Sequence, residues 1–472
     1  MPGDNQISIA ARPAADVVVV MVPFVAQGHL NQLLHLSRLV SAYNIPVHFV
    51  CTTHHIGQAR SRHRSFDQLS DVSTHIHFHE FPTPPYTTPP PHPTIPFPTH
   101  LQPSFDSTLH LRHPVADLIR SLSQKVKRVA VVHDVLMSYV VQDVKSIPNA
   151  ETYVFQPPPA FYRAASHWEK TGGSFPVDLE LMNRLPSQDG ISSPEFLKFV
   201  MLQRSHFNFH VGELYDSSRV IEGKFIEYLE REDISGQTKI WAIGPFNPVL
   251  QIESNVTVSG NRHKCLQWLD KQPAKSVIYV SFGTTTTFTD DQIRELAIGL
   301  ERSGQRFIWV VQPVDIGDEY GFEDRKVELP DGFEERVKER GLVERRWAPQ
   351  LEILGHFATG GFMSHCGWNS SIESISMGVP MATWPMHSDQ PRNAFLITEV
   401  FGIGVAVKEW DRRKELVTAM VVEDAVKTLM ISEVGEEMRR RAEKLAGEVK
   451  RSVEKGGASR KELDSFISYI TR

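Results

Sequence analysis

The sequence predicts an α/β protein with two doubly wound halves, and two pairs of apolar runs carry that prediction. Asp16–Met21 is a continuous β-branched run, typical of a strand buried inside a parallel sheet. A glycine-containing loop, a helical leucine stripe and another strand at Val47–Val50 follow it, which is the order of a βαβ unit. Farther along, Ser276–Ser281 and Phe307–Val311 flank a predicted helix in the same order. We expect ligands at the carboxyl ends of these parallel strands.

The composition of the 472 residues argues against several classes of protein. An apolar fraction of 41% and a charged fraction of 22% are ordinary for a globular protein, and a net charge of −6 gives no basic surface for nucleic acid. Cys51, Cys265 and Cys366 form no C-x-x-C pair, which argues against a disulfide framework or a structural zinc site. No apolar run approaches the ~20 residues of a membrane span, and no secretory signal pattern is present. We therefore expect a cytoplasmic protein; the chain carries no signal for an oligomeric state.

Two polar residues lie where a doubly wound sheet would bring them together. His29 lies in the loop Pro23–Asn31, directly after the first strand. Arg128–Val132 is another buried strand, and His133–Asp134 ends it. A histidine with a carboxylate partner is a typical general base. The alternative for His29 is a loop residue that caps the following helix.

Two other stretches of the first half predict a strand and a long loop. Ser73–Glu80 alternates polar and apolar residues and places His75, His77 and His79 on one face. We interpret it as a strand rather than a metal site, because no further ligand follows at useful spacing. Pro82–Pro103 is rich in proline, and a long extended loop of this kind often shapes a binding site in an enzyme.

The middle of the chain is less regular. Phe161–Trp168 predicts a helix, and Gly212–Leu229 predicts a strand end followed by a helix. Ser174–Phe207 has no clear period and receives no assignment. Asn247–Arg262 is polar, contains Gly, Ser and Asn, and predicts a linker between the halves.

The most informative stretch is Gly360–Gln390. A short apolar run, a turn at His365–Gly367 and a helix start follow one another there. Backbone N–H groups and the helix dipole make such a point attractive to anions. Asn369 and Ser370 add donors for a diphosphate, His365 adds another, and Glu373 lies one turn farther on, where a carboxylate suits a ribose diol. On this stretch alone, a capped helix in an α/β core explains the pattern equally well.

The region from Trp347 to Gln390 resembles the signature box of plant family 1 glycosyltransferases that use UDP-sugars. The match covers Trp347, Gln350, His356, Gly361, His365, Gly367, Trp368, Asn369, Ser370, Glu373, Gly378, Pro380, Asp389 and Gln390. The resemblance extends over nearly the whole chain and implies the GT-B fold, two Rossmann-like domains facing across a cleft. It implies an acceptor-binding domain over residues 1–246, a linker over 247–262, a donor-binding domain over 263–455 and a terminal helix, 456–472, packed back on the first domain.

The same resemblance implies a role for each residue of the box. Trp347, with Ala348 beside it, would stack on uracil, and Gln350 and Glu373 would bind the ribose. The diphosphate would be held by Ser281, Thr284, His365, Asn369 and Ser370. Trp368, Asp389 and Gln390 would bind the sugar, and Gln390 is the form that favours glucose without excluding xylose. The sequence has no D-x-D motif, so we expect UDP-glucose as donor and no metal.

The family pattern also places its catalytic histidine and aspartate at His29 and Asp134. His29 would remove the proton of the acceptor hydroxyl as it attacks the anomeric carbon, and the helix start would stabilise the departing UDP. A single displacement of this kind inverts the anomeric centre, so an α-linked donor should give a β-glycoside.

Several stretches of the first half resemble the zeatin O-glucosyltransferase subgroup, among them Gln27–Leu39, His75–Phe81 and Val131–Asp134. The run Gln156–Ala160 departs from that subgroup at a strand end facing the cleft, which leaves the acceptor open. We expect a small plant acceptor, either the hydroxyl of a cytokinin such as zeatin or a phenolic hydroxyl. C-glucosylation of a flavonoid or related phenolic by the same base is the alternative.

Other classes fit less well. A nucleotide-sugar-binding protein without turnover would not need both His29 and Asp134. A nicotinamide-dependent dehydrogenase lacks its G-x-G-x-x-G fingerprint, because Gly402–Val407 contains only G-x-G with no following helix. A serine hydrolase lacks G-x-S-x-G, and Cys366 beside His365 on one turn is a poor geometry for a thiol nucleophile.

Overall fold

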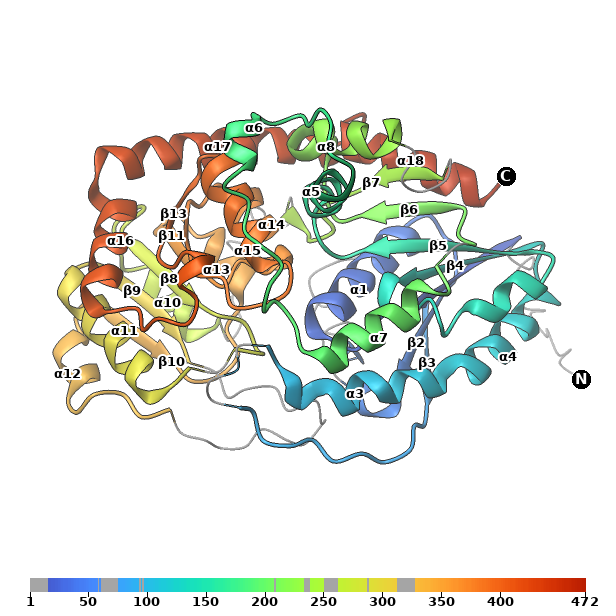
Figure 1. Cartoon of the computed structure of the whole chain (residues 1–472), viewed down its shortest axis with the longest axis horizontal. Coiled ribbons are helices and arrows are strands. Elements are labelled where there is room, and N and C mark those ends of the chain that lie inside the picture. The colour runs from blue at the N-terminus through green and yellow to red at the C-terminus, as the bar shows by residue number, and fades with distance from the viewer. Residues whose placement is uncertain are drawn as a thin grey trace, which may run out of the picture.

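The computed structural model describes residues 16–472 apart from 58, 61–74, 93, 94, 96, 208, 233–237, 250–261, 287 and 312–326. Two parallel sheets lie side by side, each flanked by helices (Figure 1). This is the arrangement of two doubly wound halves that the sequence predicts. Most of the predicted linker lies outside the described residues.

The first sheet has seven strands in the order β3-β2-β1-β4-β5-β6-β7. Its central strand pair is β1 and β4, in which Val22 pairs with His133, so the loops after both strands meet at one edge. All six residues of β1 are buried, as expected for a β-branched strand covered on both faces. The strands are β1 (Val17–Val22), β2 (Val47–Thr52), β3 (Ile76–Phe81), β4 (Arg128–Asp134), β5 (Ala150–Gln156), β6 (Gly212–Tyr215) and β7 (Lys239–Ala242).

The second sheet has six strands in the order β10-β9-β8-β11-β12-β13. In the pairing of β8 with β11, Ser281 lies opposite Ser364, which places the loops holding Thr284 and His365 side by side. The strands are β8 (Val277–Ser281), β9 (Arg306–Val310), β10 (Gly341–Glu344), β11 (Thr359–Ser364), β12 (Met381–Thr383) and β13 (Gly404–Ala406).

Helices cover both sheets. The unassigned stretch Ser174–Phe207 contains two of them, α6 and α7. The α-helices are α1 (Gln27–Ser41), α3 (Gln102–Ser107), α4 (Arg112–Ser123), α5 (Ala160–Thr171), α6 (Leu179–Met182), α7 (Pro194–Arg204), α8 (Arg219–Arg231), α10 (Lys264–Leu269), α11 (Asp290–Ser303), α12 (Phe333–Val337), α13 (Gln350–Leu354), α14 (Trp368–Met377), α15 (Gln390–Phe395), α16 (Ala419–Ile431), α17 (Glu433–Val453) and α18 (Ala458–Ile470). Short 3₁₀ turns are η1 (Thr99–Leu101), η2 (Thr108–Leu111), η3 (Val135–Met137), η4 (Gln142–Ser146) and η6 (Trp410–Arg412), and η5 (Leu396–Val400) is a π-helical turn.

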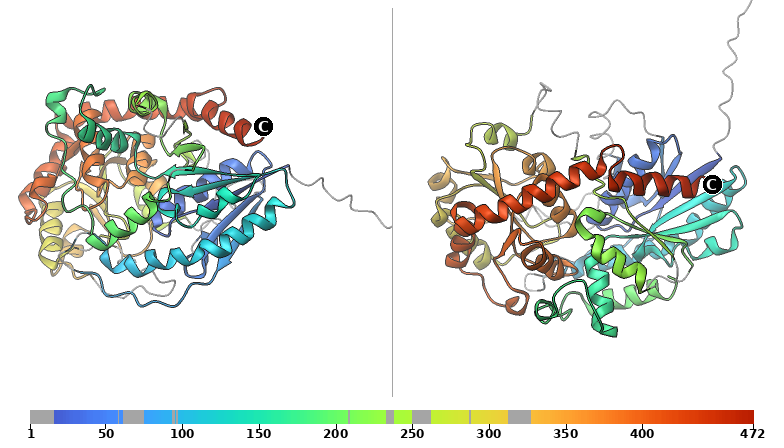
Figure 2. Two further views of the ribbon diagram at one scale, coloured as in Figure 1. Left: turned by 45° about the vertical axis from the view of Figure 1, so that its right-hand side comes forward. Right: turned by 90° about the horizontal axis from the view of Figure 1, so that it is seen from above.

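The end of the chain returns to the first sheet. Helix α17 runs from the second half to the first and leads into α18, as the view from above shows (Figure 2). Leu463, Phe466 and Ile470 of α18 are buried in the apolar cluster of the first sheet. The polypeptide therefore joins the halves twice, once in the middle of the chain and once near its end.

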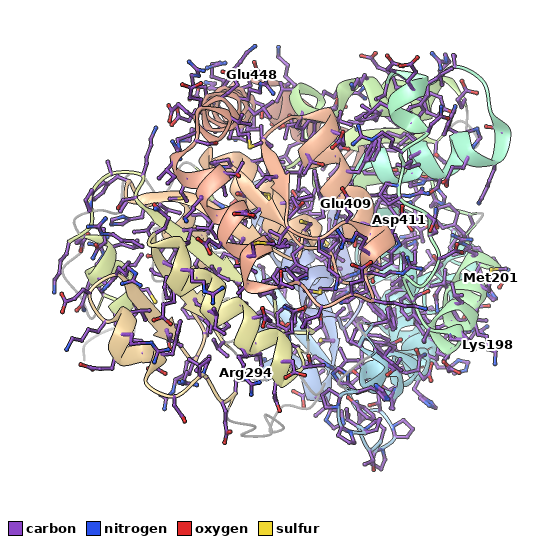
Figure 3. The ribbon with its side chains drawn as sticks, turned by 60° about the vertical axis from the view of Figure 1, so that its left-hand side comes forward. Lys198, Met201, Arg294, Glu409, Asp411 and Glu448 are labelled. Carbon is purple, nitrogen blue, oxygen red and sulfur yellow. The ribbon has the colours of Figure 1, made fainter. Side chains whose placement is uncertain are left out.

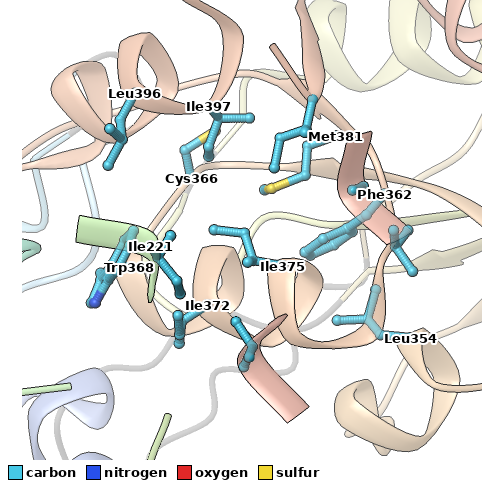
Figure 4. Packing of buried hydrophobic residues seen from close by; sticks show 14 of the residues in the cluster. Ile221, Leu354, Phe362, Cys366, Trp368, Ile372, Ile375, Met381, Leu396 and Ile397 are labelled. Carbon is cyan, nitrogen blue, oxygen red and sulfur yellow. The ribbon is translucent and has the colours of Figure 1, made fainter. Parts of the chain in front are cut away.

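One apolar core extends across the junction of the two halves. Ile221 of α8, the helix between strands β6 and β7 of the first sheet, packs in the same cluster as Trp368 and Ile372 of α14 from the second half (Figure 4). Burial of apolar surface at this junction stabilises the two halves against each other. Among the described residues, no helix combines the length and apolar composition needed to cross a membrane.

Candidate active site

The predicted site residues come together in one cleft between the two sheets. Its volume is about 2420 Å³, well above the roughly 300–1,000 Å³ of a pocket for one small ligand. Every predicted residue except Asp134 lines the cleft, and Asp134 lies directly behind His29. The cleft is therefore large enough for two substrates at once.

His29 and Asp134 form a hydrogen-bonded pair on the side of the first sheet. The loop predicted over Pro23–Asn31 is shorter than expected, because α1 begins at Gln27 and His29 lies in its first turn. Nδ1 of His29 lies 2.7 Å from Oδ2 of Asp134, the last residue of the neighbouring strand β4. The other carboxylate oxygen accepts the backbone N–H of Leu136 at 2.8 Å. Asp134 is fully buried, so it holds the imidazole in one orientation with Nδ1–H as the donor. In the neutral ring the lone pair is then on Nε2.

The surroundings of His29 favour its protonated form. Burial lowers the pKa of His29, but the charge and hydrogen bond of Asp134, with a smaller attraction from Asp389, outweigh it and leave the pKa raised. A raised pKa makes the neutral imidazole a stronger base. Asp389 belongs to the other half and lines the same cleft as His29.

His133 does not compete with Asp134 for this role. It is buried, its Nδ1 lies 2.9 Å from the Asp134 carbonyl oxygen, and burial lowers its pKa to about 4. Successive residues of a strand point to opposite faces, which separates the two neighbours.

The start of α14 lies where the sequence predicts an anion site. The helix begins at Trp368, with Gly367 as N-cap and no side-chain cap, so Asn369 and Ser370 lie in its first turn, directly after the predicted turn at His365–Gly367. The first backbone N–H groups of α14 are thereby left for a ligand. Cys366, at φ 64°, makes the sharp turn between β11 and this helix.

Two glycines leave room for His365 at this point. A Cβ on Gly367 would lie 2.7 Å from Nε2 of His365, and a Cβ on Gly283 would lie 3.0 Å from the same ring. His365 Nδ1 is buried without a partner, and burial lowers the pKa of His365 to about 4. A neutral, unpartnered ring beside a helix start is ready to donate to a phosphate oxygen.

The predicted ribose residues contact one another. Nε2 of Gln350 donates to Oε2 of Glu373 at 2.7 Å and to Oγ of Ser370 at 3.0 Å. Burial raises the pKa of Glu373 to about 7, with the Gln350 amide opposing the shift and Asp216 adding to it. Trp347 lines the same end of the cleft with 66% of its surface exposed, which leaves a ring face free for a base.

The predicted sugar residues are already partly engaged. The indole N–H of Trp368 donates to the carbonyl oxygen of Asp216 at 2.8 Å, across to the first half. Oδ2 of Asp389 accepts from Nδ2 of Asn393 at 2.6 Å, and burial raises the pKa of Asp389. Oε1 of Gln390 accepts the backbone N–H groups of residues 386 and 387, and its Nε2 lies 3.5 Å from Nε2 of His387. Asn369 also bridges the halves, because its Nδ2 donates to the Gly28 carbonyl oxygen at 2.7 Å.

Sequence reasoning missed Asp216, which lies between the halves. Its carboxylate accepts from Nε2 of Gln32 at 3.2 Å and from the backbone N–H of Phe246 at 2.8 Å. Burial raises its pKa to about 7, although both hydrogen bonds oppose the shift. Its position directly after strand β6, at the carboxyl edge of the sheet, is the signal that marks it.

An aromatic cluster lies in the cleft on the side of the first sheet. Phe24 packs against His29 at 5.3 Å between ring centroids and against Phe105 at 4.8 Å, and Phe97 packs against Phe196 at 5.0 Å. These residues form an aromatic part of the cleft wall, which polar side chains of the first half also line. Phe196 belongs to α7, which had no assignment from sequence; α7 turns Lys198 and Met201 outward (Figure 3). Flat apolar walls of this kind suit a flat acceptor.

Two groups of possible metal ligands lie outside the cleft wall. His77 and His79 are on one face of β3, as predicted, whereas His75 lies before the strand, which begins at Ile76. His79 Nε2 lies 2.8 Å from Nδ1 of His48 on β2. His263, Cys265 and Glu344 have ligand atoms within 4.8 Å of one another, but Nζ of Lys264 already lies 3.0 Å from the Glu344 carboxylate. Neither group touches the predicted diphosphate residues.

Comparison with known families matches both halves. Residues 15–248 match the model of the glycosyltransferase N-terminal domain, and residues 211–439 match UDP-glucoronosyl and UDP-glucosyl transferase. A zeatin O-glucosyltransferase from Phaseolus lunatus is 51% identical over 97% of both chains. A zeatin O-xylosyltransferase from Phaseolus vulgaris is 50% identical over 98% of this chain and 100% of its own. The chain belongs to the plant family 1 UDP-glycosyltransferases.

Solved structures agree with that placement. The crystal structure of TcCGT1 in complex with UDP superposes with a TM-score of 0.78 at 26% identity, covering 97% of this chain and 99% of the other. The two sheets are therefore the two domains of a GT-B fold. As a UDP-glycosyltransferase, the protein is a UDP-dependent hexosyltransferase that takes a UDP-sugar as donor and a small molecule as acceptor.

Proposed function

We propose that this UDP-glycosyltransferase moves glucose from UDP-glucose to the side-chain hydroxyl of zeatin, with His29 as general base and inversion at the anomeric carbon. The observation that carries the mechanism is the His29–Asp134 pair, 2.7 Å apart, on the wall opposite the start of α14. The identity of 51% to a zeatin O-glucosyltransferase over 97% of the chain supports the acceptor.

The geometry supports a division of labour in the transfer. Under this proposal residues 1–246 bind the acceptor, residues 263–455 bind the donor, and 456–472 return to the first half. Nε2 of His29 takes the proton of the acceptor hydroxyl as its oxygen bonds to the anomeric carbon and the bond to UDP breaks. The backbone N–H groups at the start of α14, with His365, Ser370, Ser281 and Thr284, stabilise the charge that develops on the departing diphosphate.

The donor residues have separate tasks in this scheme. Trp347, beside Ala348, stacks on uracil; Gln350 and Glu373 hold the ribose; Asn369 adds to the diphosphate site; Trp368, Asp389 and Gln390 hold the sugar. Because donors and a helix dipole cover the diphosphate charge, we propose that transfer needs no metal ion. Full activity in the presence of EDTA is the expected result, and loss of activity restored by Mg²⁺ would contradict it.

A panel assay tests the substrates. The purified protein is incubated with UDP-glucose and zeatin, a flavonoid or a simple phenol, and the products are treated with acid. The expected product is a zeatin glucoside that acid cleaves; an acid-stable flavonoid product would favour C-glucosylation instead. A flat aromatic pocket is compatible with each of these acceptors, so the panel decides between them.

UDP-xylose is the second candidate donor, because a zeatin O-xylosyltransferase is 50% identical over nearly the whole chain. Gln390 lines the cleft, and the resemblance to the family's box implies that a glutamine at this position favours glucose. Competition between UDP-glucose and UDP-xylose at equal concentration should give mainly the glucoside. A predominantly xylosylated product would reassign the donor. We also propose a cytosolic location, which cell fractionation tests.

A further inference from the structure

A buried arginine joins the two halves next to the donor-sugar residues. Arg392 lies two residues after Gln390, in the first turn of α15, and only 1% of its surface is exposed. Taking a guanidinium out of water is costly unless it is paired and hydrogen-bonded. A guanidinium buried this deeply beside the donor-sugar residues therefore needs a carboxylate and hydrogen-bond acceptors around it.

Those partners all come from the acceptor half. Nη2 of Arg392 lies 2.5 Å from Oε2 of Glu169, and Nη1 donates to Oγ of Ser166 at 2.8 Å. The guanidinium also lies over the ring of Tyr162, 5.6 Å from its centroid. Tyr162, Ser166 and Glu169 are four and three residues apart on α5, so they form one face of that helix.

A loop of the acceptor half completes the enclosure. With its amide oxygen facing the guanidinium, Gln188 accepts from Nη1 of Arg392 at 2.9 Å and from Nη2 at 3.1 Å. In the same loop the carbonyl oxygen of Ile191 accepts the backbone N–H of Ser388 at 2.8 Å. Contacts to the acceptor half therefore hold the chain on both sides of Asp389 and Gln390.

Helix α5 is a firm anchor for such a contact. Its first two N–H groups, from Ala160 and Phe161, donate to the buried carboxylate of Glu222 at 3.1 and 2.8 Å. Tyr162 and Ser166 of α5 also line the cleft. The helix that touches Arg392 is thus part of the wall around the acceptor, and it is fixed at its N-terminus.

We propose that Arg392 is a positioning residue for sugar transfer: its contacts with α5 hold the start of α15, and with it Asp389 and Gln390, at a fixed place relative to His29. The charge of Asp389 already acts on His29 across the cleft, so a small shift of α15 changes the alignment of donor sugar and base. Misplacement by about 1 Å is enough to cost roughly a hundredfold in rate. This inference rests on the proposed roles of His29, Asp389 and Gln390.

The chain offers a matched control pair. Nη1 of Arg184 lies 2.9 Å from Oε2 of Glu399, which also joins the acceptor half to the segment that follows α15. The Arg184 side chain is 66% exposed, and Glu399 lies at the far end of that segment from Asp389. An exposed pair of this kind contributes little. A variant of Arg184 therefore tests whether the loss of any ion pair between the halves gives the same result.

The experiment compares full-length Arg392→Lys, Glu169→Gln and Arg184→Gln with the wild type. Titrations measure the Kd of UDP and of UDP-glucose, and assays measure the kcat of transfer to zeatin and the ratio of UDP-glucose hydrolysis to transfer. For Arg392→Lys and Glu169→Gln we expect an unchanged Kd for UDP. The Kd for UDP-glucose should rise roughly fivefold, because about one hydrogen bond to the sugar is lost. We expect kcat to fall on the order of tenfold and the hydrolysis ratio to rise, since misalignment harms the larger acceptor more than water.

Two results would overturn the proposal. One is wild-type UDP-glucose affinity and hydrolysis ratio in Glu169→Gln, and the other is an equal change in Arg184→Gln. Glu169 is partly exposed, so its variant decides the question even where Arg392→Lys fails to fold. The binding titrations need no acceptor. If zeatin is not a substrate, the proposed acceptor is wrong, but the binding titrations still test the role of Arg392.

Discussion

The cleft wall proposed to bind the donor (the donor wall) and the wall proposed to bind the acceptor (the acceptor wall) are built in different ways. The donor wall is polar and comes from strand ends and the start of α14, where backbone N–H groups, His365 and the Gln350–Glu373 pair converge. The acceptor wall carries an aromatic cluster and comes from loops and from α1, α3, α5 and α7, with His29 as its proposed base. A wall built from regular backbone geometry suits a ligand that does not vary, here the proposed UDP. In a wall built from side chains, substitutions can change which acceptor binds while the proposed base and donor site stay the same.

Loss of the proposed base should have the largest effect on turnover while leaving UDP binding unchanged. His29→Ala removes the group that accepts the proton, so we expect turnover to fall by about 10³-fold, within the range of general-base catalysis. The donor wall remains intact, and calorimetry should find the Kd of UDP within about twofold of the wild type. His113→Ala on the exposed surface of α4 is the control, with wild-type turnover expected. Near-normal turnover in His29→Ala would contradict the assignment of the base.

Asp134→Asn should have the next largest effect and shift the pH profile. We expect kcat/KM to fall by about 10²-fold, since the imidazole loses its orientation and the partner of its charged form. His29 acts as a base only when neutral, so kcat/KM rises with pH through its pKa. Asp134 raises that pKa, and removing the charge should move the ascending limb to lower pH.

The pH shift distinguishes His29 from two other groups. Glu373 and Asp216 also have pKa values near 7, so a rise of activity near neutrality is not by itself specific. An ascending limb that stays in place in Asp134→Asn would assign it to one of these carboxylates instead of His29.

Loss of the uracil platform should affect the donor alone. Trp347→Ala removes an exposed ring, and base stacking contributes about 1–3 kcal/mol, so the Kd of UDP should rise about tenfold. The KM of zeatin should stay unchanged. Met420→Ala, at another exposed apolar residue, serves as the control. Equal losses for UDP and zeatin would mean that the two walls are not independent.

The smallest effect is expected on the acceptor wall. Phe97→Leu removes ring contacts with Phe196 and His387 at 5.0 and 5.6 Å. Aromatic contacts of this kind contribute about 0.5–1.5 kcal/mol, so the KM of zeatin should rise about threefold to tenfold. Titration with UDP should give the wild-type Kd. A weaker Kd for UDP would show that Phe97 supports the donor wall.

The same contrast explains what the sequence could predict. The donor wall depends largely on short-range order, strand, turn and helix start, so the resemblance of the stretch from Trp347 to Gln390 to a family signature was enough to predict most of its residues. The His29–Asp134 pair followed from the ends of two strands that a parallel sheet places side by side. Asp216, Gln188 and Arg392 owe their roles to contacts between segments far apart in the chain. No local pattern marks such contacts, and α7 has no periodicity that would have placed Phe196 against Phe97 and Phe105 in the cleft wall.

The anomeric configuration of the product tests the central claim most directly. Attack by an acceptor that His29 deprotonates, opposite the UDP held at α14, is a single displacement, so glucose from α-linked UDP-glucose must emerge β-linked. The coupling of the anomeric proton in the NMR spectrum of the purified glucoside reads this configuration. The predicted result is the large coupling of a β-glucoside; the small coupling of an α-glucoside would contradict the mechanism.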